Sequence, residues 1–418
     1  MQSTKQRPHT PIAALVVIGL GWALLGSAAN AQTSHPGTAP LTLQTLFEQA
    51  WQRQPEAQSV ALRREAARAT RSAAAAWTAE PVALELSTKT DRPGSNQGSR
   101  EAEVGLALPL WLPGERDSSQ ALADAEGEAV AGRHEALRLK LAQTLREAWW
   151  AWQSARNEVA LAGERLVAAR RLRDDVARRF TAGDLSRADL NQAQGVLALA
   201  EAQQAEGEAM LAGARYRLES LTGQPAGSGD VQPEPEPQAA AAAHPLLREV
   251  QARGEVARRN LDLARAQGRA NPEIAVATRR ERIASSEPTE QTWALALRIP
   301  FSAGPRQDAR VATASAEAIE AGVEHEREAE RLAREAEAVR RQVQAGRQQL
   351  AAAEQRARLA RENRGFYEKS FRLGESDLPT RLRIESEAFE AERALGRARI
   401  ALAQGISQLR QSLGLLPE

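Results

Sequence analysis

The sequence predicts a mainly α-helical chain built from two copies of one unit, each with long coiled-coil helices and a pair of β-strands. The first observation behind this is internal similarity, because Phe180-x-x-Gly183 is answered by Phe371-x-x-Gly374, 191 positions later. Three other landmark pairs keep nearly the same spacing: Glu80-Pro81 with Asn271-Pro272, Leu108-Pro109-Leu110 with Ile299-Pro300-Phe301, and Gln54-Pro55 with His244-Pro245. A repeat of this length indicates a duplicated half-chain. The other two observations are strand-like alternation and helical heptads in both copies.

The chain divides into a leader, two repeats and a linker. A basic start, an apolar run from Ile12 to Leu25 and the small-residue site Ala29-Asn30-Ala31 are typical of a secretory signal peptide. A membrane anchor, the alternative, needs roughly 20 apolar residues, which is more than this run provides. We expect a signal peptide over 1–31, a first repeat over 32–223, a linker over 224–243 and a second repeat over 244–418. The linker is rich in Pro, Gly and Ala, and we expect it to be a surface connection.

Four segments alternate apolar and polar residues with period two, which indicates strands at about 81–90, 100–110, 272–280 and 291–300. Loops rich in Gly, Pro, Asn and Ser join them as two hairpins. Isolated hairpins do not form a stable sheet, so further strand partners are expected. Trp77, Trp111, Trp293 and Phe301 flank the strands, as aromatic side chains do at the two interfaces of a membrane barrel wall. The alternative is a soluble hairpin subdomain in which these aromatic side chains form a core.

The helices are expected to carry most of the chain. Apolar residues recur every three or four positions from Leu137 to Phe180, and heptad seams with many small residues run from Leu190 to Leu221 and from Ile384 to Leu409. A helix from Ser118 to Ala182 would be roughly 97 Å long at 1.5 Å per residue. A rod of that length belongs in an extended assembly.

Composition and motifs argue against several functions. The formal net charge is +1, so no basic excess favours nucleic acid as a partner, and the lack of Cys excludes a disulfide framework. His35, His134, His244 and His325 are scattered, without metal-ligand spacing, a phosphate loop or a Ser/His/Asp arrangement. The charged run Glu324–Arg341 is typical of a solvated helix face. We therefore expect no enzyme activity, no cofactor and no metal site.

The duplicated unit, the segment LPLWLPGERD after the first hairpin, and the motifs FTAGDLSRADLNQAQ and FRLGESDLPTRLR resemble TolC-like outer membrane factors, in particular the CzcC-like branch associated with heavy-metal efflux. The resemblance implies a homotrimer in the bacterial outer membrane. Each protomer would give four strands to one twelve-stranded transmembrane β-barrel and its helices to a periplasmic α-barrel. The helix tips would close the tunnel and meet a periplasmic adaptor protein, itself tied to a proton-driven inner-membrane RND-type pump.

Two sets of candidate residues follow from this resemblance. Periplasmic tip, adaptor-docking and gate residues are Phe180, Gly183, Asp184, Arg187, Asp189, Phe371, Gly374, Glu375, Asp377, Thr380, Arg381 and Arg383. Lipid-facing barrel residues are Val82, Leu84, Leu86, Val104, Leu106, Leu108, Ile274, Val276, Trp293, Leu295 and Leu297. Asp189 falls where the family places an acid, whereas Thr380 and Arg383 stand where some members carry gate aspartates. That departure puts an all-carboxylate gate in doubt.

The expected function is an exit duct for heavy-metal cations, and two alternatives remain. One is an outer-membrane channel for drug or solvent efflux or for type I secretion, because the chain offers no Cys, and only Met1 and Met210, to select a soft cation. The other is a soluble periplasmic coiled-coil adaptor. An adaptor would carry its β-domain in one continuous block, whereas here strand pairs are inserted twice at the same register.

Overall fold

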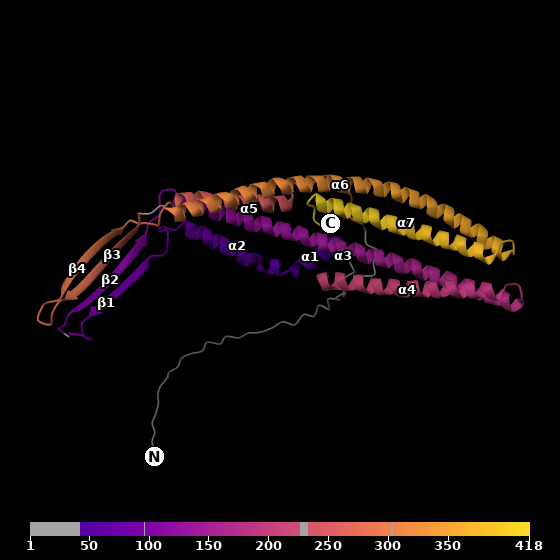
Figure 1. Ribbon diagram of the computed structural model, residues 1–418, viewed down its shortest axis with the longest axis horizontal. Helices are drawn as coiled ribbons and strands as arrows, with labels where there is room; N and C mark the ends of the chain where they lie inside the picture. The colour runs from indigo at the N-terminus through magenta and orange to yellow at the C-terminus, as the bar shows by residue number, and fades with distance from the viewer. Residues whose placement is uncertain (1–41, 96, 226–232, 302–303) are drawn as a thin grey trace, which may run out of the picture. The chain divides into compact units, whose positions relative to one another are not determined.

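The computed structural model describes residues 42–95, 97–225, 233–301 and 304–418. The predicted signal peptide, the cleavage site near Gln32 and part of the predicted linker lie outside these residues. The helices are α1 (Leu43–Gln52), α2 (Pro55–Ala74), α3 (Glu115–Ala182), α4 (Arg187–Thr222), α5 (Pro245–Ala266), α6 (Pro305–Arg372) and α7 (Leu378–Ser412). The strands are β1 (Ala83–Thr90), β2 (Arg100–Pro109), β3 (Glu273–Arg282) and β4 (Glu290–Arg298). In each half of the chain a hairpin of strands is therefore followed by a long helix, a tight turn and a shorter helix (Figure 1).

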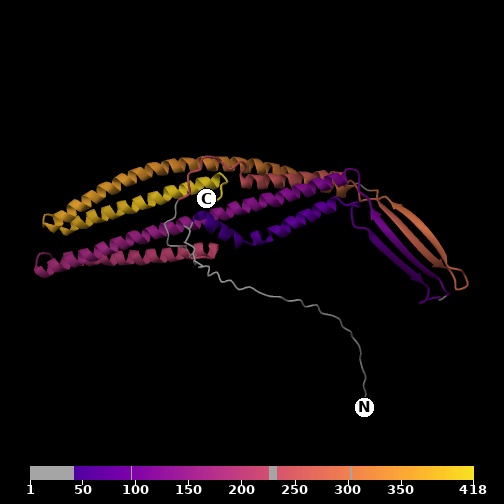
Figure 2. The ribbon, with the colours of Figure 1, turned by 180° about the vertical axis from the view of Figure 1, so that it is seen from behind.

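The two long helices match each other in length. Both α3 and α6 contain 68 residues, which corresponds to about 100 Å of helix. Proline starts α2, α5 and α6 within their first turn, where its missing N–H removes no helical hydrogen bond. Each long helix thus carries the chain from the sheet to the turn at the other end of the helical layer, as the two opposite views show (Figures 1 and 2). Among the described residues, no helix combines the length and the apolar character that crossing a membrane requires.

The two hairpins join into one antiparallel sheet in the order β1-β2-β3-β4. The central pairing is between β2 and β3, which come from different halves of the chain, and it aligns Leu106 with Val276. β3 extends to Arg282 because Glu281 and Arg282 pair with Glu101 and Arg100. This pairing continues beyond the apolar alternation, which is why the sequence pattern ended the strand near residue 280.

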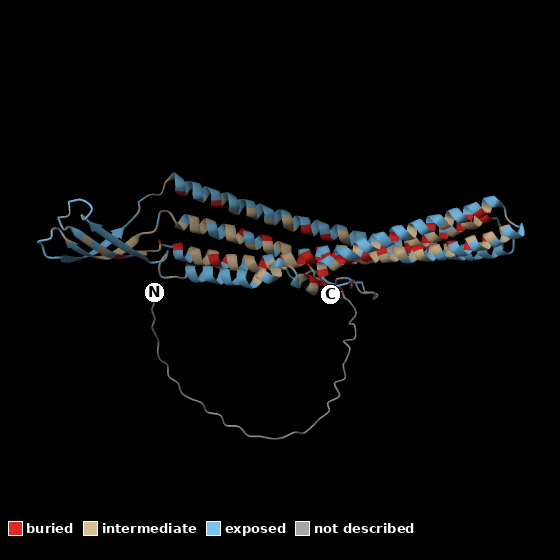
Figure 3. Ribbon diagram, turned by 90° about the horizontal axis from the view of Figure 1, so that it is seen from below, coloured by how far each residue is buried: buried red, intermediate tan, exposed pale blue. Residues whose placement is uncertain are grey.

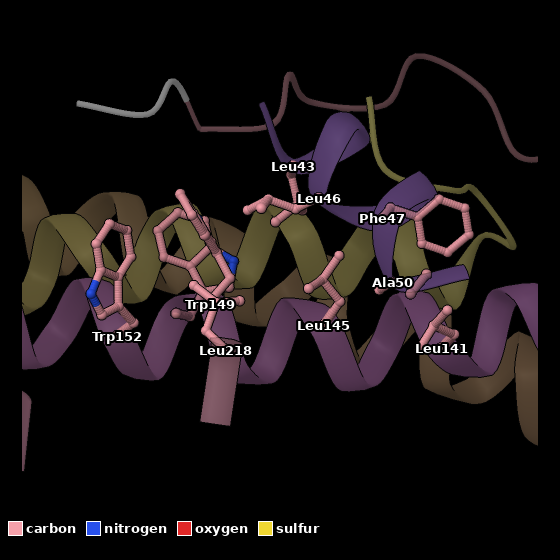
Figure 4. Close-up of a cluster of buried hydrophobic side chains, with 11 residues drawn as sticks. Leu43, Leu46, Phe47, Ala50, Leu141, Leu145, Trp149, Trp152 and Leu218 are labelled. Carbon is pink, nitrogen blue, oxygen red and sulfur yellow. The ribbon is translucent and has the colours of Figure 1, made fainter. Parts of the chain in front are cut away.

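The helices pack as a layer in which α3 touches α2, α4, α5 and α7, while α6 touches α5 and α7. Most buried residues lie on these helices, and in the described strands only Gly105 and Ala107 are buried (Figure 3). The largest cluster forms where the short helix α1 docks on α3, with Leu46 and Phe47 beside Leu145 (Figure 4). Trp149, Trp152 and Leu218 extend it toward α4.

Most described residues of the linker are exposed, in line with a surface connection, but one of them is not. Glu234 lies within the predicted surface connection, yet it is only 5% exposed. Its carboxylate accepts two hydrogen bonds from Arg146 of α3, at 2.9 and 2.7 Å, and lies 3.3 Å from Arg410 of α7. The reason is electrostatic, because two buried guanidinium groups require an anion, and the linker supplies it.

Candidate functional site: the helix turns and the sheet

The turns between the paired long and short helices share one backbone geometry. After α3, Gly183 has φ of 86°, its N–H donates to the carbonyl of Phe180, and the next N–H donates to the carbonyl of Arg179. After α6, Gly374 has φ of 81°, and the same two bonds reach Phe371 and Ser370. This is the Schellman pattern, in which glycine adopts the left-handed conformation without a Cβ penalty. Apart from the adjoining residues of the chain, no atom lies within 4 Å of the position that a Cβ would take at either glycine, so only the backbone conformation demands glycine.

Two of the predicted docking acids cap the helices that follow these turns. Asp189 closes a capping box on α4, since its carboxylate accepts from the N–H of Ser186 at 2.9 Å while its own N–H donates to the Ser186 hydroxyl at 3.2 Å. In the second turn, Asp377 accepts from the N–H of Thr380 at 3.0 Å. Hydrogen bonding by Thr380 lowers the pKa of Asp377 below its ordinary value of 3.8. Both carboxylates therefore have a structural role whatever else they contact.

The structure brings the two turns together through Phe371. This side chain is 2% exposed and packs with Leu172, Val176 and Leu378. The Arg179 guanidinium donates to the carbonyl of Phe371 at 3.2 Å and lies 4.8 Å from the centre of its ring. Arg381 lies over the same ring at 4.7 Å. A cationic group over an aromatic face is attracted to the ring, so these contacts tie the first turn to the second.

The repeat is imperfect at this position. Phe180 is only half-buried, and its aromatic contact is with Arg187 at 5.8 Å. Phe180 and Phe371 occupy equivalent sequence positions, but Phe371 alone is fully inside the cluster.

The remaining predicted tip residues are directed to solvent. Asp184 and Glu375 are exposed, and neither carboxylate forms an ion pair with any described residue. Arg383 is exposed and pairs with Glu387 one turn along α7, at 2.7 Å. The exposed charges of the predicted docking set are thus these three, Arg187 and the helix-capping Asp377.

One titratable residue near the turns was missed by the sequence analysis. Burial raises the pKa of Glu385 above its ordinary value of 4.5, although Arg381 and Arg364 oppose the shift. Its position four residues after Arg381 was the available signal, because residues four apart share a helix face.

All predicted lipid-facing residues within the strands lie on one face of the sheet, which we call the apolar face. Directly paired residues of an antiparallel sheet point to the same side, so the register defines rows across it. The rows are Leu108–Ile274–Leu297, Leu84–Leu106–Val276–Leu295 and Leu86–Val104–Thr278–Trp293. Val82 directly precedes β1 and is exposed. Leu108 and Ile274 are half-buried, whereas Leu295 is 78% exposed.

The other side of the sheet, which we call the opposite face, is small and charged. Near the helices it carries alanines, as in the row Ala83–Ala107–Ala275–Ala296. Its acidic side chains are Glu85, Glu101, Glu103, Glu273, Glu281 and Glu290, and its basic side chains are Lys89, Arg279 and Arg298. Arg279 bridges Glu101 at 3.1 Å and Glu103 at 2.9 Å. Acidic groups therefore outnumber basic ones on this face.

In the part of the chain that the structure describes, no group of three or more His, Asp or Glu side chains is arranged to hold a metal ion.

The first half of this architecture matches a known family. Residues 46–224, from within α1 to just past the end of α4, match the family model described as outer membrane efflux protein. No curated protein matches the chain.

Solved structures share the whole fold at low sequence identity. A membrane protein from Pseudomonas aeruginosa aligns with a TM-score of 0.73 and 18% identity, covering 90% of this chain and 97% of that one. The outer membrane protein VceC from Vibrio cholerae gives 0.72 and 18%, with 89% and 96% covered. CusC, described in connection with transmembrane channel formation, gives 0.74 and 18%, with 90% and 92% covered. These likenesses confirm the predicted fold class of long helices combined with few strands.

Proposed function

We propose that the chain is an outer-membrane channel, the exit duct of a tripartite efflux system, with its helices in the periplasm. The observation that carries this proposal is the apolar face. Trp293 and Leu295 on it are 74% and 78% exposed, and the flanking Trp77 and Phe301 are 94% and 85% exposed. Large apolar patches on a protein surface mark a partner or a membrane. A sheet with apolar side chains on one side and small or charged ones on the other matches the wall of a water-filled barrel.

Unpaired edges support the proposed homotrimer. In the sheet of the described chain, β1 and β4 each have one neighbour only, and an open edge is costly in lipid. The helical layer likewise ends at α2 and α4 on one side and at α6 on the other. Cyclic association of three protomers would pair β4 with β1 of the next copy and close both layers. The result would be the twelve-stranded barrel and the periplasmic α-barrel expected above.

The exposed tip charges are proposed to meet a periplasmic adaptor that is tied to an RND-type inner-membrane pump. Charge reversal by Asp184→Lys with Glu375→Lys should weaken crosslinking to the adaptor without lowering the yield of trimer, because neither side chain holds the turn. Asp189→Ala is the matched control, since it removes the carboxylate that closes the capping box with Ser186 and should lower stability by about 1 kcal/mol. Loss of trimer in the double Lys variant would show that those residues are structural.

For cargo, we propose heavy-metal cations, with drug or solvent efflux and type I secretion as the alternatives. The excess of carboxylates on the opposite face supports the cation proposal, because a negatively charged lining raises the local concentration of cations. Deletion of the gene, followed by growth with cobalt, zinc, cadmium or nickel and with a panel of dyes and detergents, tests it. Unchanged metal tolerance with new dye sensitivity would overturn the cation proposal and leave the channel intact.

Membrane fractionation with a heat-modifiability gel tests the channel itself. The protein should appear in the outer-membrane fraction and migrate as a trimer unless boiled. Its N-terminus should begin near Gln32 if residues 1–31 are a cleaved signal peptide. Recovery as a soluble periplasmic protein would favour the adaptor alternative instead.

A further inference from the structure

The apolar face ends in a groove with a different character. Beyond the row that contains Leu86 and Val104, the next rows are Thr88–Ala102–Arg280–Gln291 and Thr90–Arg100–Arg282. These two rows lie at the strand ends farthest from the helices (Figure 1). All of their residues except Gln291 line a groove of about 450 Å³, together with Lys89, Glu101, Thr289 and Arg92 from the β1–β2 loop. We call this the arginine groove. It continues the apolar face directly, because successive rows lie about 7 Å apart along the strands.

The arginines of the groove have no anionic partner within the described chain. Arg92, Arg100 and Arg280 are exposed, Arg282 is half-buried, and none of the four forms an ion pair with a described residue. Arg282 makes one long hydrogen bond, 3.4 Å, to the carbonyl of Gly98. The situation differs on the opposite face, where Arg279 is held between two glutamates.

The two faces of the sheet carry charged side chains of different predominant sign. All charged residues on the apolar face of the described strands are arginines, namely Arg100, Arg280 and Arg282, whereas the opposite face carries an excess of glutamates. If these charged side chains only kept the strand ends soluble, acidic side chains or lysine would do so as well as arginine. Guanidinium groups bind phosphate oxygens with two parallel hydrogen bonds, which makes arginine the preferred residue for phosphate recognition.

We propose that the arginine groove binds the phosphate groups of lipid headgroups in the outer leaflet of the outer membrane. The proposal rests on the channel function, which places the strand ends farthest from the helices at the outer leaflet. A lipid whose acyl chains lie against Leu86 and Val104 would present its headgroup one or two rows higher, at Arg100, Arg280 and Arg282. Thr88 and Thr90 add hydroxyl groups at the same level.

Titration of the purified trimer in detergent with diphosphoryl lipid A tests this proposal through the midpoint of thermal unfolding, which a ligand of the folded state raises. The wild-type midpoint should rise with diphosphoryl lipid A and should not rise with the same lipid after its phosphates are removed. The variant Arg100→Gln/Arg280→Gln/Arg282→Gln should bind roughly a hundredfold more weakly, from about a fivefold contribution of each arginine near a lipid headgroup.

Two further variants serve as controls. Arg63→Gln/Arg64→Gln/Arg68→Gln on α2 removes the same charge far from the sheet and should bind like the wild type. Replacing the three groove arginines with lysine keeps the charge but loses the paired hydrogen bonds, so binding should fall between that of the wild type and that of the glutamine variant.

Three results would overturn the proposal. They are equal binding by the wild type and the glutamine variant, equal loss of binding in the α2 control, and equal stabilisation by inorganic phosphate at the same phosphate concentration. The last would leave a phosphate site without lipid recognition. Because the titration uses purified protein, its failure is separate from failure of the channel proposal, which fractionation detects.

Discussion

Replacement of Glu234 by alanine should destabilise the protein strongly, because this residue neutralises two buried guanidinium groups. Arg146 and Arg410 are each 3% exposed. Arg146 also donates to the side chain of Gln411 at 2.6 Å and to the carbonyl of Leu415 at 3.1 Å, so it would stay in place after the substitution. Arg146 would then remain buried without a counterion, and Arg410 beside it would keep only the exposed carboxylate of Glu418, 2.9 Å away.

The magnitude follows from the burial. Removing one partner of a buried ion pair costs about 3–5 kcal/mol, since the uncompensated charge remains out of water. At roughly 2 °C per kcal/mol for a chain of this size, the thermal midpoint should fall by about 6–10 °C. Replacing all three members with apolar residues, as in Arg146→Met/Glu234→Leu/Arg410→Met, should cost far less, because no buried charge is left.

The linker itself provides a matched control. Glu236 lies two residues farther along, is exposed and pairs with the exposed Arg347. Exposed pairs contribute about 0–1 kcal/mol, so Glu236→Ala should change the midpoint by 2 °C or less. The midpoints should be compared by heat-modifiability gel and tryptophan fluorescence at one protein concentration, because the proposed trimerisation would make them concentration-dependent. Equal midpoints for Glu234→Ala and Glu236→Ala would refute the assigned role of the buried ion pairs.

Three other predictions follow from single sites. If the protein is the proposed membrane channel, Leu295→Arg on the apolar face should destabilise it by about 2–4 kcal/mol. Ala294→Arg, its exposed neighbour on the opposite face, should change conductance instead. Equal loss of the folded protein in urea titration would contradict the assigned faces. Gly374→Ala should lower the stability of the protein by about 1–2 kcal/mol, because the left-handed backbone there disfavours a Cβ. Gly195→Ala inside α4, where a Cβ has free space, should raise the stability by about 1 kcal/mol. Both changes can be measured as shifts of the thermal midpoint. Burial lowers the pKa of His244 below 6.5, so protonation of this side chain favours the unfolded state, and the free energy of unfolding should fall as the pH drops below 6.5. His244→Asn keeps a hydrogen-bond acceptor at the start of α5 and should flatten this part of the pH–stability curve.

The parts of the fold that the sequence predicted are those with local, periodic signals. The alternation around Leu106 and Leu295 identified strands and assigned their faces, because side chains of a strand alternate strictly. The paired Phe-x-x-Gly motifs located both helix turns, since positive φ leaves glycine as the favoured residue. The union of two hairpins into one sheet was not specified by these signals, because the contact of β2 with β3 joins segments far apart in the chain.

The missed features depend on partners distant in sequence. Glu234 stands in a Pro-rich segment without periodicity, and its partner Arg146 is 88 positions away. Asp189 was interpreted through its place in a family motif, although Ser186-x-x-Asp189 also fits a capping box.

The position of the buried ion pairs follows from how the two copies are joined. α7 ends and α5 begins at the same level, and both helices pack against α3 and α6. The end of α7 lies in close contact with the segment that leads into α5. The N–H of Ala241 donates to the carbonyl of Leu413 at 3.1 Å, and Gly414 has φ of 77°, with its Cβ position only 2.7 Å from Pro245.

The carbonyl groups of the tail that follows α7 lie beyond the helix, so their donors must come from elsewhere. The two buried arginines supply donors there, since Arg146 donates to the carbonyl of Leu415 at 3.1 Å and Arg410 to that of Leu416 at 3.5 Å. Arg410 also donates to the carbonyl of Pro235 in the linker, at 3.1 Å. Both donors are guanidinium groups, which carry a positive charge, and a buried positive charge requires a carboxylate beside it. The linker supplies this carboxylate through Glu234, because the linker passes the end of α7 before α5 begins. The helices are interrupted where the two copies meet, and this interruption explains why Arg146 and Arg410 are buried there. It also explains why the linker, which has no periodic pattern, contains the buried Glu234.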